Sequence, residues 1–550
     1  MQVQAVEVKT KTRRQKTSKK RQQTFLGRLR ALPWTTWLFL AVIIFFATLR
    51  FRLRDMPLER DEGEYAYSGQ LMLQGVPPYQ LAYNMKLPGT YAAYALSMAI
   101  FGQTSSGIRL GLLLINAATS VLVFALGKKL FGKTAAVVSG ITYALLSISP
   151  SMFGIVAHAE HFVIFPALAG ILILLYAIEA DRRLLFFCSG TLLGLAFLMK
   201  QPGIAFAAFA FFYFIYRSWK QPIDWQYLGS RGGILFAGVV WPFALTCLLL
   251  YSAGVFSKFW FWTFSYARAY GSEVRFVEGL EYLLGSLRGI FPLSNGIGIL
   301  ALAGLIMIFR RRDMAALRSF VLGLLFFSFV GVSAGFYFRN HYFVLLLPVV
   351  ALLTGVAIEY AVQALQQRQF GPLVLPILTI IFGLAIVASV YRDAPVLFSA
   401  NSIEACHRMY RNNPFPEAQQ IAEYLKSNSS PDARLAVLGS EPEIYFYSQR
   451  HSVTGYIYTY GLMEDQAYAG QMQQEMIHEV TNARPEYVAF VDADLSWLWQ
   501  RGGSQDAFFQ WVQMLINTQY VKAAQVDIPG TAKHMTGPVA RIYLFRRKAQ

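Results

Sequence analysis

Long apolar runs, separated by short charged or polar turns, fill most of the chain up to about residue 390. Most runs are about 15 to 20 residues long and carry few charges, which is close to the length that an α-helix needs to cross a bilayer. They lie at residues 33–49, 108–126, 134–148, 162–178, 184–198, 202–216, 232–251, 291–309, 319–336, 342–360 and 374–391. The pattern predicts a polytopic α-helical membrane domain over residues 31–391, with about eleven transmembrane helices.

The apolar pattern changes after residue 391, where short periods of both kinds replace the long runs. Strands are expected at residues 434–439, 487–491 and 542–545, and helices at residues 441–449 and 471–481. Residues 392–550 are therefore predicted to form a small α/β domain.

The distribution of basic residues predicts how the chain crosses the membrane. Ten lysines and arginines, against one acidic residue, lie within residues 1–30, which are expected to form a disordered arm that touches anionic lipid. Three arginines at residues 310–312 follow a span that is expected to run inward. Because loops rich in Lys and Arg face the cytoplasm, the N-terminus is predicted to be cytoplasmic. The domain at residues 392–550 then lies on the outer face of the plasma (inner) membrane, periplasmic or extracellular.

The segment at residues 90–101 is apolar but short for a span. If it crossed the membrane, the next span would place Lys128, Lys129 and Lys133 on the outside. The charge rule therefore favours a helix that lies in the interface. Residues 51–107 then form the first outer loop.

A second outer segment, residues 254–289, is rich in aromatic side chains. Trp260, Trp262, Tyr266 and Tyr270 lie within it. Such residues gather at membrane–water interfaces, so the segment is expected to form an aromatic belt or a lid.

Composition agrees with a membrane protein, because 55% of the residues are hydrophobic and only 15% are charged. The net charge of +18 does not indicate nucleic-acid binding, since the basic residues sit in the arm and the inner turns and form no aromatic-rich module. The cysteines, Cys188, Cys247 and Cys406, imply no disulfide framework. No small-residue cleavage site follows the first apolar run, so it is expected to be a retained anchor.

Three carboxylates, Asp61, Glu62 and Glu64, lie together just beyond the first span. Two interpretations of this acidic stretch stay open. Asp61 and Glu64 have the spacing of a capping box at the start of an interfacial helix that stops near Gly75. That interpretation leaves Glu62 unexplained, and the stretch can instead carry chemistry.

Polar residues gather at the outer ends of the predicted spans. They are Asp61, Glu62, Glu64, Lys86, His158, Glu160, His161, Lys200, Arg339, His341 and Tyr342. Such groups are costly beside lipid, which makes them functional candidates. A carboxylate can accept the proton of an attacking hydroxyl while Lys and Arg stabilise an anionic leaving group. The set predicts group transfer from a lipid phosphate.

The sequence His158-Ala159-Glu160-His161 contains metal-ligand types, although its spacing matches no standard motif such as His-Glu-x-x-His. A divalent metal is therefore possible, and an ordinary polar loop is the alternative. The three cysteines lie far apart in the sequence and form no zinc-ligand cluster such as Cys-x-x-Cys.

Several short motifs occur in a characteristic order. They lie at residues 60–65, 86–91, 127–132, 194–202, 338–343 and 439–446. Together they resemble the GT-C superfamily of membrane glycosyltransferases. Within it they are most similar to the branch that holds the protein O-mannosyltransferases (dolichyl-phosphate-mannose-protein mannosyltransferases) and the aminoarabinose transferase of lipid A. The resemblance covers roughly residues 33–545.

Such enzymes transfer a sugar from a polyprenyl-phosphate donor to an acceptor on the outer face, with inversion at the anomeric carbon. The resemblance implies that Asp61 is the catalytic base, that Glu62 assists it, and that Glu160 is a second acidic position. Lys86 matches a cation near the donor phosphate. The other residues expected to bind substrate are Lys200, Arg339, His341 and Tyr342.

Two departures from the family pattern concern the same residues. The family often has Asp where this chain has Glu160, and Lys-Pro-Pro where it has Lys86-Leu87-Pro88.

The acceptor stays open among a glycolipid, a glycan and a protein. The alternative function is a non-catalytic transporter or flippase of lipid-linked glycans, which predicts charged mid-membrane segments and an internal repeat. Neither feature is found in the sequence.

Overall fold

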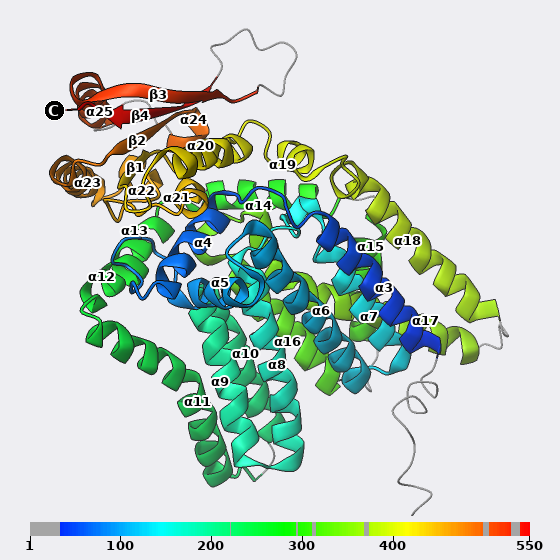
Figure 1. Cartoon of the computed structure of the whole chain (residues 1–550). Coiled ribbons are helices and arrows are strands. Elements are labelled where there is room, and N and C mark those ends of the chain that lie inside the picture. Colours follow the sequence, from blue (N-terminus) through cyan, green and yellow to red (C-terminus); the bar gives the residue numbers. More distant parts are fainter. Residues whose placement is uncertain are drawn as a thin grey trace, which may run out of the picture.

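The computed structural model describes residues 34–219, 222–292, 295–310, 315–367, 373–498, 505–529 and 540–549. A helical bundle makes up the larger part of these residues, and a small domain with one sheet covers one of its ends (Figure 1). The predicted arm at residues 1–30 and two of the arginines at residues 310–312 lie outside the described part of the chain.

The predicted polytopic α-helical fold is confirmed, because every expected span coincides with a helix. The helices are α3 (Trp34–Arg52), α4 (Arg60–Leu73), α5 (Pro88–Phe101), α6 (Ser105–Leu130), α7 (Lys133–Leu146), α8 (Ala159–Ala180), α9 (Arg183–Met199), α10 (Ile204–Ser218), α11 (Trp225–Ser252), α12 (Phe256–Trp260), α13 (Ala267–Gly271), α14 (Phe276–Ile290), α15 (Gly296–Arg310), α16 (Ala315–Val332), α17 (Leu347–Gln367) and α18 (Val374–Leu397). Apolar runs in lipid form helices because a helix satisfies its own backbone polar groups.

Six segments of the described chain are long and apolar enough to cross a membrane. They are Thr35–Arg52, Ser105–Leu130, Ala159–Ala180, Trp225–Ser252, Asn340–Gln367 and Val374–Leu397. Four shorter apolar helices, Lys133–Leu146, Arg183–Met199, Gly296–Arg310 and Leu317–Val332, lie between them in the sequence. The protein is therefore a multi-pass membrane protein.

Small residues let the bundle helices approach closely. A Cβ atom added to Gly190 of α9 would lie 2.9 Å from the Cα atom of Gly238 in α11. Close contacts of this kind are typical of helix pairs in membranes, where packing holds the helices together. Helix α9 thereby packs between α8 and α11, while α17 packs between α7 and α15.

Helix α4 begins with a capping box that Glu59 and Glu62 form. The Glu59 side chain accepts a hydrogen bond from the backbone N–H of Glu62 at 2.9 Å, and the Glu62 side chain accepts one from the N–H of Glu59 at 3.3 Å. The expectation that Asp61 and Glu64 form this box is wrong, because the helix already begins at Arg60. Asp61 lies in the first turn and is free to point away from the helix end.

The predicted C-terminal α/β domain is present. Its elements are α19 (Ser402–Tyr410), α20 (Phe415–Asn428), β1 (Leu435–Leu438), α21 (Glu443–Ser448), α22 (Tyr460–Met463), α23 (Ala469–Ala483), β2 (Tyr487–Asp492), α24 (Asp494–Trp497), α25 (Gln505–Gln519), β3 (Tyr520–Asp527) and β4 (Arg541–Arg547). The strand order is β1-β2-β4-β3, with β1 parallel to β2 and the other neighbours antiparallel. The three expected strands are found, whereas β3 was not expected.

Helix α4 joins this domain to the bundle. Arg60 donates a hydrogen bond to a carboxylate oxygen of Glu441 at 2.8 Å, and the rings of Tyr67 and Tyr445 stack with centroids 5.1 Å apart. Gly63 lies so close to Glu443 that a Cβ atom would come within 2.6 Å of its backbone nitrogen. A buried apolar core runs from α4 and α5 into β1 and β2, separate from the core of the bundle. The domain is thus held at the end of the bundle that carries α4 and α5 (Figure 1).

Candidate active site

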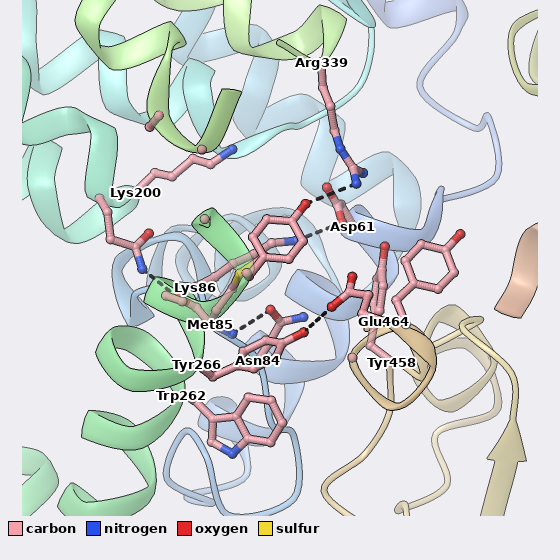
Figure 2. Close-up of a pocket in the computed structure, with 18 of the residues that line it drawn as sticks. Asp61, Asn84, Met85, Lys86, Lys200, Trp262, Tyr266, Arg339, Tyr458 and Glu464 are labelled. Atoms are coloured by element: carbon pink, nitrogen blue, oxygen red, sulfur yellow. Dashed lines mark hydrogen bonds and ion pairs between the residues drawn. The ribbon is translucent and has the colours of Figure 1, made fainter. Parts of the chain in front are cut away.

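The largest set of predicted site residues surrounds one cavity between the bundle end and the external domain. Its volume is about 210 Å³. Asp61, Lys86, Lys200, Arg339, His341 and Tyr342 all line it. Figure 2 shows Asp61, Lys86, Lys200 and Arg339 directed toward the same space from separate elements. The structure therefore brings together three cations and one carboxylate that are far apart in the sequence.

Lys86 is held between two carboxylates of α4. Its Nζ atom donates to Asp61 at 2.8 Å and to Glu64 at 3.0 Å. Glu64 also accepts hydrogen bonds from the Asn84 amide at 2.7 Å and the Tyr91 hydroxyl at 2.7 Å. Asn84 and Tyr91 thus position Glu64, which in turn positions the Lys86 ammonium group. The second carboxylate oxygen of Asp61 is left for other partners.

The electrostatics keep both partners of this pair ionised. Burial alone would raise the pKa of Asp61, but the charge and hydrogen bond of Lys86, together with the smaller effects of His158 and Arg339, outweigh it and hold that pKa well below its usual range. Burial likewise acts against a charged Lys86, but the charges of Asp61 and Glu64 raise the pKa of Lys86 well above its usual value. Asp61 is thus an ionised acceptor across the physiological pH range.

Two histidines stack beside Asp61. The rings of His158 and His341 lie 4.1 Å apart with an angle of 11° between their planes. The His158 Nδ1 atom is 4.0 Å from an Asp61 oxygen and 3.8 Å from a Glu59 oxygen. Burial, with the nearby charges of Lys200 and Lys86, lowers the pKa of His158 to about 3. His158 is therefore neutral at physiological pH.

Glu160 lies behind the cavity wall and pairs with Lys200. The Lys200 Nζ atom donates to Glu160 at 2.5 Å and lies 4.3 Å from the centre of the Tyr342 ring. Glu160 is buried and is not among the described residues that line the cavity. In this arrangement Glu160 orients Lys200, and Lys200 faces the cavity.

Glu62 points away from the cavity into the bundle. Its two carboxylate oxygens accept hydrogen bonds from Arg109 at 3.1 and 2.5 Å and from the backbone N–H of Ala157 at 2.7 Å. Its side chain is fully buried. Successive helix positions differ in direction by about 100°, and here Glu62 faces the bundle while Asp61 faces the cavity. The predicted assisting role of Glu62 therefore has no geometric support.

The aromatic segment predicted as a belt or lid forms part of the cavity wall. Trp262, Tyr266 and Tyr270 line the cavity, and Tyr270 accepts a hydrogen bond from Arg339 at 3.1 Å. Residues 261–266 form a turn of π-helix, a geometry often found at functional sites. Trp260 is not among the cavity-lining residues.

The external domain supplies wall residues that the sequence analysis did not identify. Tyr458, Tyr460, Gly461, Leu462 and Glu464 line the cavity opposite the bundle. No motif or period marks them, because polar and aromatic residues are ordinary in a soluble domain. Only their position against α4 reveals them.

A second, more open hollow of about 390 Å³ meets the cavity at Asp61. Both spaces share Asp61, Arg339 and His341, and the second one extends toward Phe153 and Tyr410. Asp61 is thus accessible from two directions.

Three possible metal ligands lie close together beside the cavity. Asp61, His158 and His341 offer ligand atoms within 4.8 Å of one another, and the buried His158 Nδ1 atom has no hydrogen-bond partner among the described residues. An imidazole binds a metal in the plane of its ring. Two parallel stacked rings cannot both direct a nitrogen at one ion, and Asp61 is already paired with Lys86. The residues as packed do not fit a single ion held by all three.

Comparison with known proteins agrees with this architecture. The family model for dolichyl-phosphate-mannose-protein mannosyltransferase matches residues 86–264. No curated protein sequence matches the chain significantly.

Solved structures resemble the whole chain. ArnT from Cupriavidus metallidurans bound to undecaprenyl phosphate is 15% identical, with a TM-score of 0.58 over 93% of this chain and 97% of that one. The archaeal oligosaccharyltransferase AglB from Archaeoglobus fulgidus, in complex with an inhibitory peptide and a dolichol-phosphate, is 12% identical, with a TM-score of 0.51 over 93% of this chain and 76% of that one. At these identities the likeness concerns the fold. The chain therefore shares the fold of these two proteins, and its residues 86–264 are similar to the dolichyl-phosphate-mannose-protein mannosyltransferase family.

Proposed function

We propose that the protein is an inverting glycosyltransferase, which moves a sugar from a polyprenyl-phosphate donor to an envelope acceptor on the outer face of the membrane. The observation that carries the proposal is the cavity in which Asp61 faces Lys86, Lys200 and Arg339. Three fixed cations suit an anionic phosphate, and one ionised carboxylate suits a proton that leaves a hydroxyl. The polyprenyl phosphates bound to ArnT and AglB support this choice of donor.

In the proposed reaction, the acceptor hydroxyl attacks the anomeric carbon of the donor sugar. The new carbon–oxygen bond forms as the bond from that carbon to the phosphate oxygen breaks. Polyprenyl phosphate leaves with the bonding electron pair, and Lys86, Lys200 and Arg339 stabilise its charge. The hydroxyl proton passes to Asp61. A weak base suffices, because the hydroxyl becomes strongly acidic once it begins to bond to the anomeric carbon.

The two connected spaces suit two substrates. The cavity with the three cations would hold the phosphate and sugar of the donor, and the second hollow would hold the acceptor. Asp61 lies at their junction, where attack takes place. A glycolipid, a glycan and a protein each present a hydroxyl of the required kind.

The test measures transfer by the purified full-length protein from radiolabelled polyprenyl-phosphate sugars to an envelope extract. We expect Asp61→Asn to lower the rate at least about 100-fold, which is the usual scale for loss of a general base. Lys86→Ala is expected to weaken binding of the donor as well. Asp55→Asn is the matched control, because Asp55 is an exposed acid of the same loop that bonds Ser106. Transfer by Asp61→Asn at a rate near that of the wild type would show that the assigned base is wrong.

A further inference from the structure

The external domain contributes one carboxylate, Glu464, to the cavity that the three cations also line. Glu464 follows α22 directly, at the edge of the cavity that also holds Lys86, Lys200 and Arg339. Figure 2 shows its side chain on the same side of the cavity as Tyr458 and Asp61. The mechanism proposed above gives it no role. A half-buried carboxylate at a substrate cavity requires a partner that can donate hydrogen bonds.

One oxygen of Glu464 already has a partner. The hydroxyl of Tyr266 donates to its Oε2 atom at 2.8 Å. Among the described residues, Glu464 forms no ion pair within 4.0 Å, although three cations line the same cavity. The bond to Tyr266 therefore fixes the carboxylate while leaving its other oxygen available for a ligand.

Several aromatic side chains line the same cavity as Glu464, and Tyr266 among them contacts it. Trp262 stacks on Tyr83 with ring centroids 5.6 Å apart, and both rings line the cavity with Tyr266 and Tyr458. Aromatic faces pack well against the C–H faces of sugar rings, and carboxylates accept hydrogen bonds from sugar hydroxyls. The wall around Glu464 combines both features.

The position of Glu464 relative to the cations indicates that it would contact the sugar of the donor and not that of the acceptor. In a polyprenyl-phosphate sugar the ring is bonded directly to the phosphate. If Lys86, Lys200 and Arg339 bind that phosphate, the ring must lie in the same cavity, which Glu464 also lines. Burial and the nearby Glu273 raise the pKa of Glu464 to about 7, whereas the hydrogen bond from Tyr266 and the charge of Arg339 act in the opposite direction. We propose that Glu464 of the external domain binds hydroxyl groups of the donor sugar, and that this domain thereby helps to select which sugar is transferred. This inference rests on the proposed function, since it requires a lipid-phosphate sugar in the cavity.

The experiment separates binding of the sugar from binding of the lipid phosphate. The full-length protein in lipid nanodiscs is titrated, without acceptor, with undecaprenyl phosphate and with its mannosyl, glucosyl, galactosyl and xylosyl derivatives. The ratio of the two dissociation constants, bare over glycosylated, measures the gain from the sugar. The titrations are run at pH 8, above the pKa of about 7 for Glu464, so that its carboxylate is mostly ionised. For the sugar with the largest gain we expect Glu464→Gln to reduce the ratio about tenfold, the usual effect of one charge-assisted hydrogen bond. The Kd of undecaprenyl phosphate itself should change less than about twofold.

Two further variants make the result specific. Tyr266→Phe removes the hydrogen bond that positions Glu464, so it should lower the ratio by a smaller factor. Glu475→Gln is the matched control, because Glu475 of the same domain also accepts a hydrogen bond from a tyrosine, Tyr456 at 2.5 Å, but does not line the cavity. It should leave both dissociation constants unchanged.

The outcomes distinguish this inference from the proposed function. An unchanged ratio in Glu464→Gln, an equal loss of affinity for bare and glycosylated lipid, or a wild type that gains nothing from any of the four sugars would overturn the inference. A wild type that binds undecaprenyl phosphate and transfers sugar would leave the proposed function intact in each of those cases. A wild type that fails to bind undecaprenyl phosphate would overturn both.

Discussion

Asp61 and Glu62 are adjacent carboxylates with different surroundings. Asp61 points into the cavity and pairs with Lys86, whereas Glu62 points into the bundle and pairs with Arg109. The helical turn between them produces this division. The α4 capping box reinforces it, because Glu62 also accepts the backbone N–H of Glu59. One residue thus faces the cavity while its neighbour holds the helix in place.

We predict that Glu62→Gln destabilises the protein. The change leaves the buried Arg109 charge without its counter-charge, and breaking a buried ion pair in this way costs about 3 kcal/mol or more. Thermal unfolding in detergent should show a lower Tm than for the wild type. The double variant Glu62→Gln, Arg109→Leu should recover part of the loss, because it removes the unpaired charge. A Glu62→Gln variant as stable as the wild type would contradict the structural role of the pair.

Some residues of the cavity can be predicted from the sequence and others cannot, and the difference has a physical reason. Ionisable side chains such as Lys86, Lys200 and Arg339 stand out beside apolar spans, because a charge near lipid is rare and costly. Glu464 and Tyr458 lie in a water-exposed domain where such residues are common. The direction of the Glu62 side chain also depends on the residue at which α4 begins, and sequence patterns locate helix ends poorly.

At the scale of elements, α4 is the link between the bundle and the external domain. Its contact with α21 is close at Gly63 and places Glu443 in a fully buried position. Neither carboxylate oxygen of Glu443 has a hydrogen-bond partner among the residues that the structure describes. Burial, with the nearby negative charges of Glu441 and Glu59, raises the pKa of Glu443 well above its usual range, while Arg60 acts in the opposite direction.

We predict that Glu443 makes stability depend on pH. Its pKa is raised in the folded state, so the folded protein binds a proton that the unfolded chain releases above about pH 4.5. The contribution of Glu443 to stability is therefore greatest at low pH and is lost as the pH rises toward the folded pKa. Glu443→Gln cannot ionise, so its Tm relative to the wild type should increase between pH 5 and pH 8. A Tm difference for Glu443→Gln that stays constant over this pH range would contradict the assignment.

The elements themselves were predictable to different degrees. The spans were found because a membrane helix requires a continuous apolar run. Strand β3 was missed because it is the edge strand of the sheet and mostly exposed, so Tyr520–Asp527 has no apolar alternation to mark it. The short helix α22 and the bond between Tyr266 and Glu464 depend on contacts between distant parts of the chain, which no local pattern encodes.

At the scale of the whole molecule, the external domain lies at one end of the bundle (Figure 1), and its residues Tyr458 and Glu464 line the cavity there. Lys128 and Lys129 lie at the other end of α6, away from the cavity. The direct contacts between α4 and the external domain require both to be on the same side of the membrane. With the basic inner turns, this arrangement predicts a cytoplasmic N-terminus and an outer C-terminal domain.

A reporter fused to the C-terminus tests this orientation. Alkaline phosphatase, which is active only outside the cytoplasm, should be active in the fusion, and a green fluorescent protein at the same position should stay dark after export in unfolded form. The same pair of reporters fused after Lys129 should give the opposite result. A cytoplasmic C-terminus would overturn the number of spans and the outer-face assignment of the cavity.

The wall formed by Tyr458–Glu464 has a consequence for how the protein is made. A ribosome synthesises the bundle first and the external domain last, and domains fold largely in that order. Lys86, Lys200 and Arg339 are therefore in the membrane before the opposite wall of their cavity exists. Until the last part of the chain folds against α4, the cations face open water and no enclosed site is present. Under the proposed function, transfer from a lipid-linked sugar therefore begins only after the external domain has folded against α4.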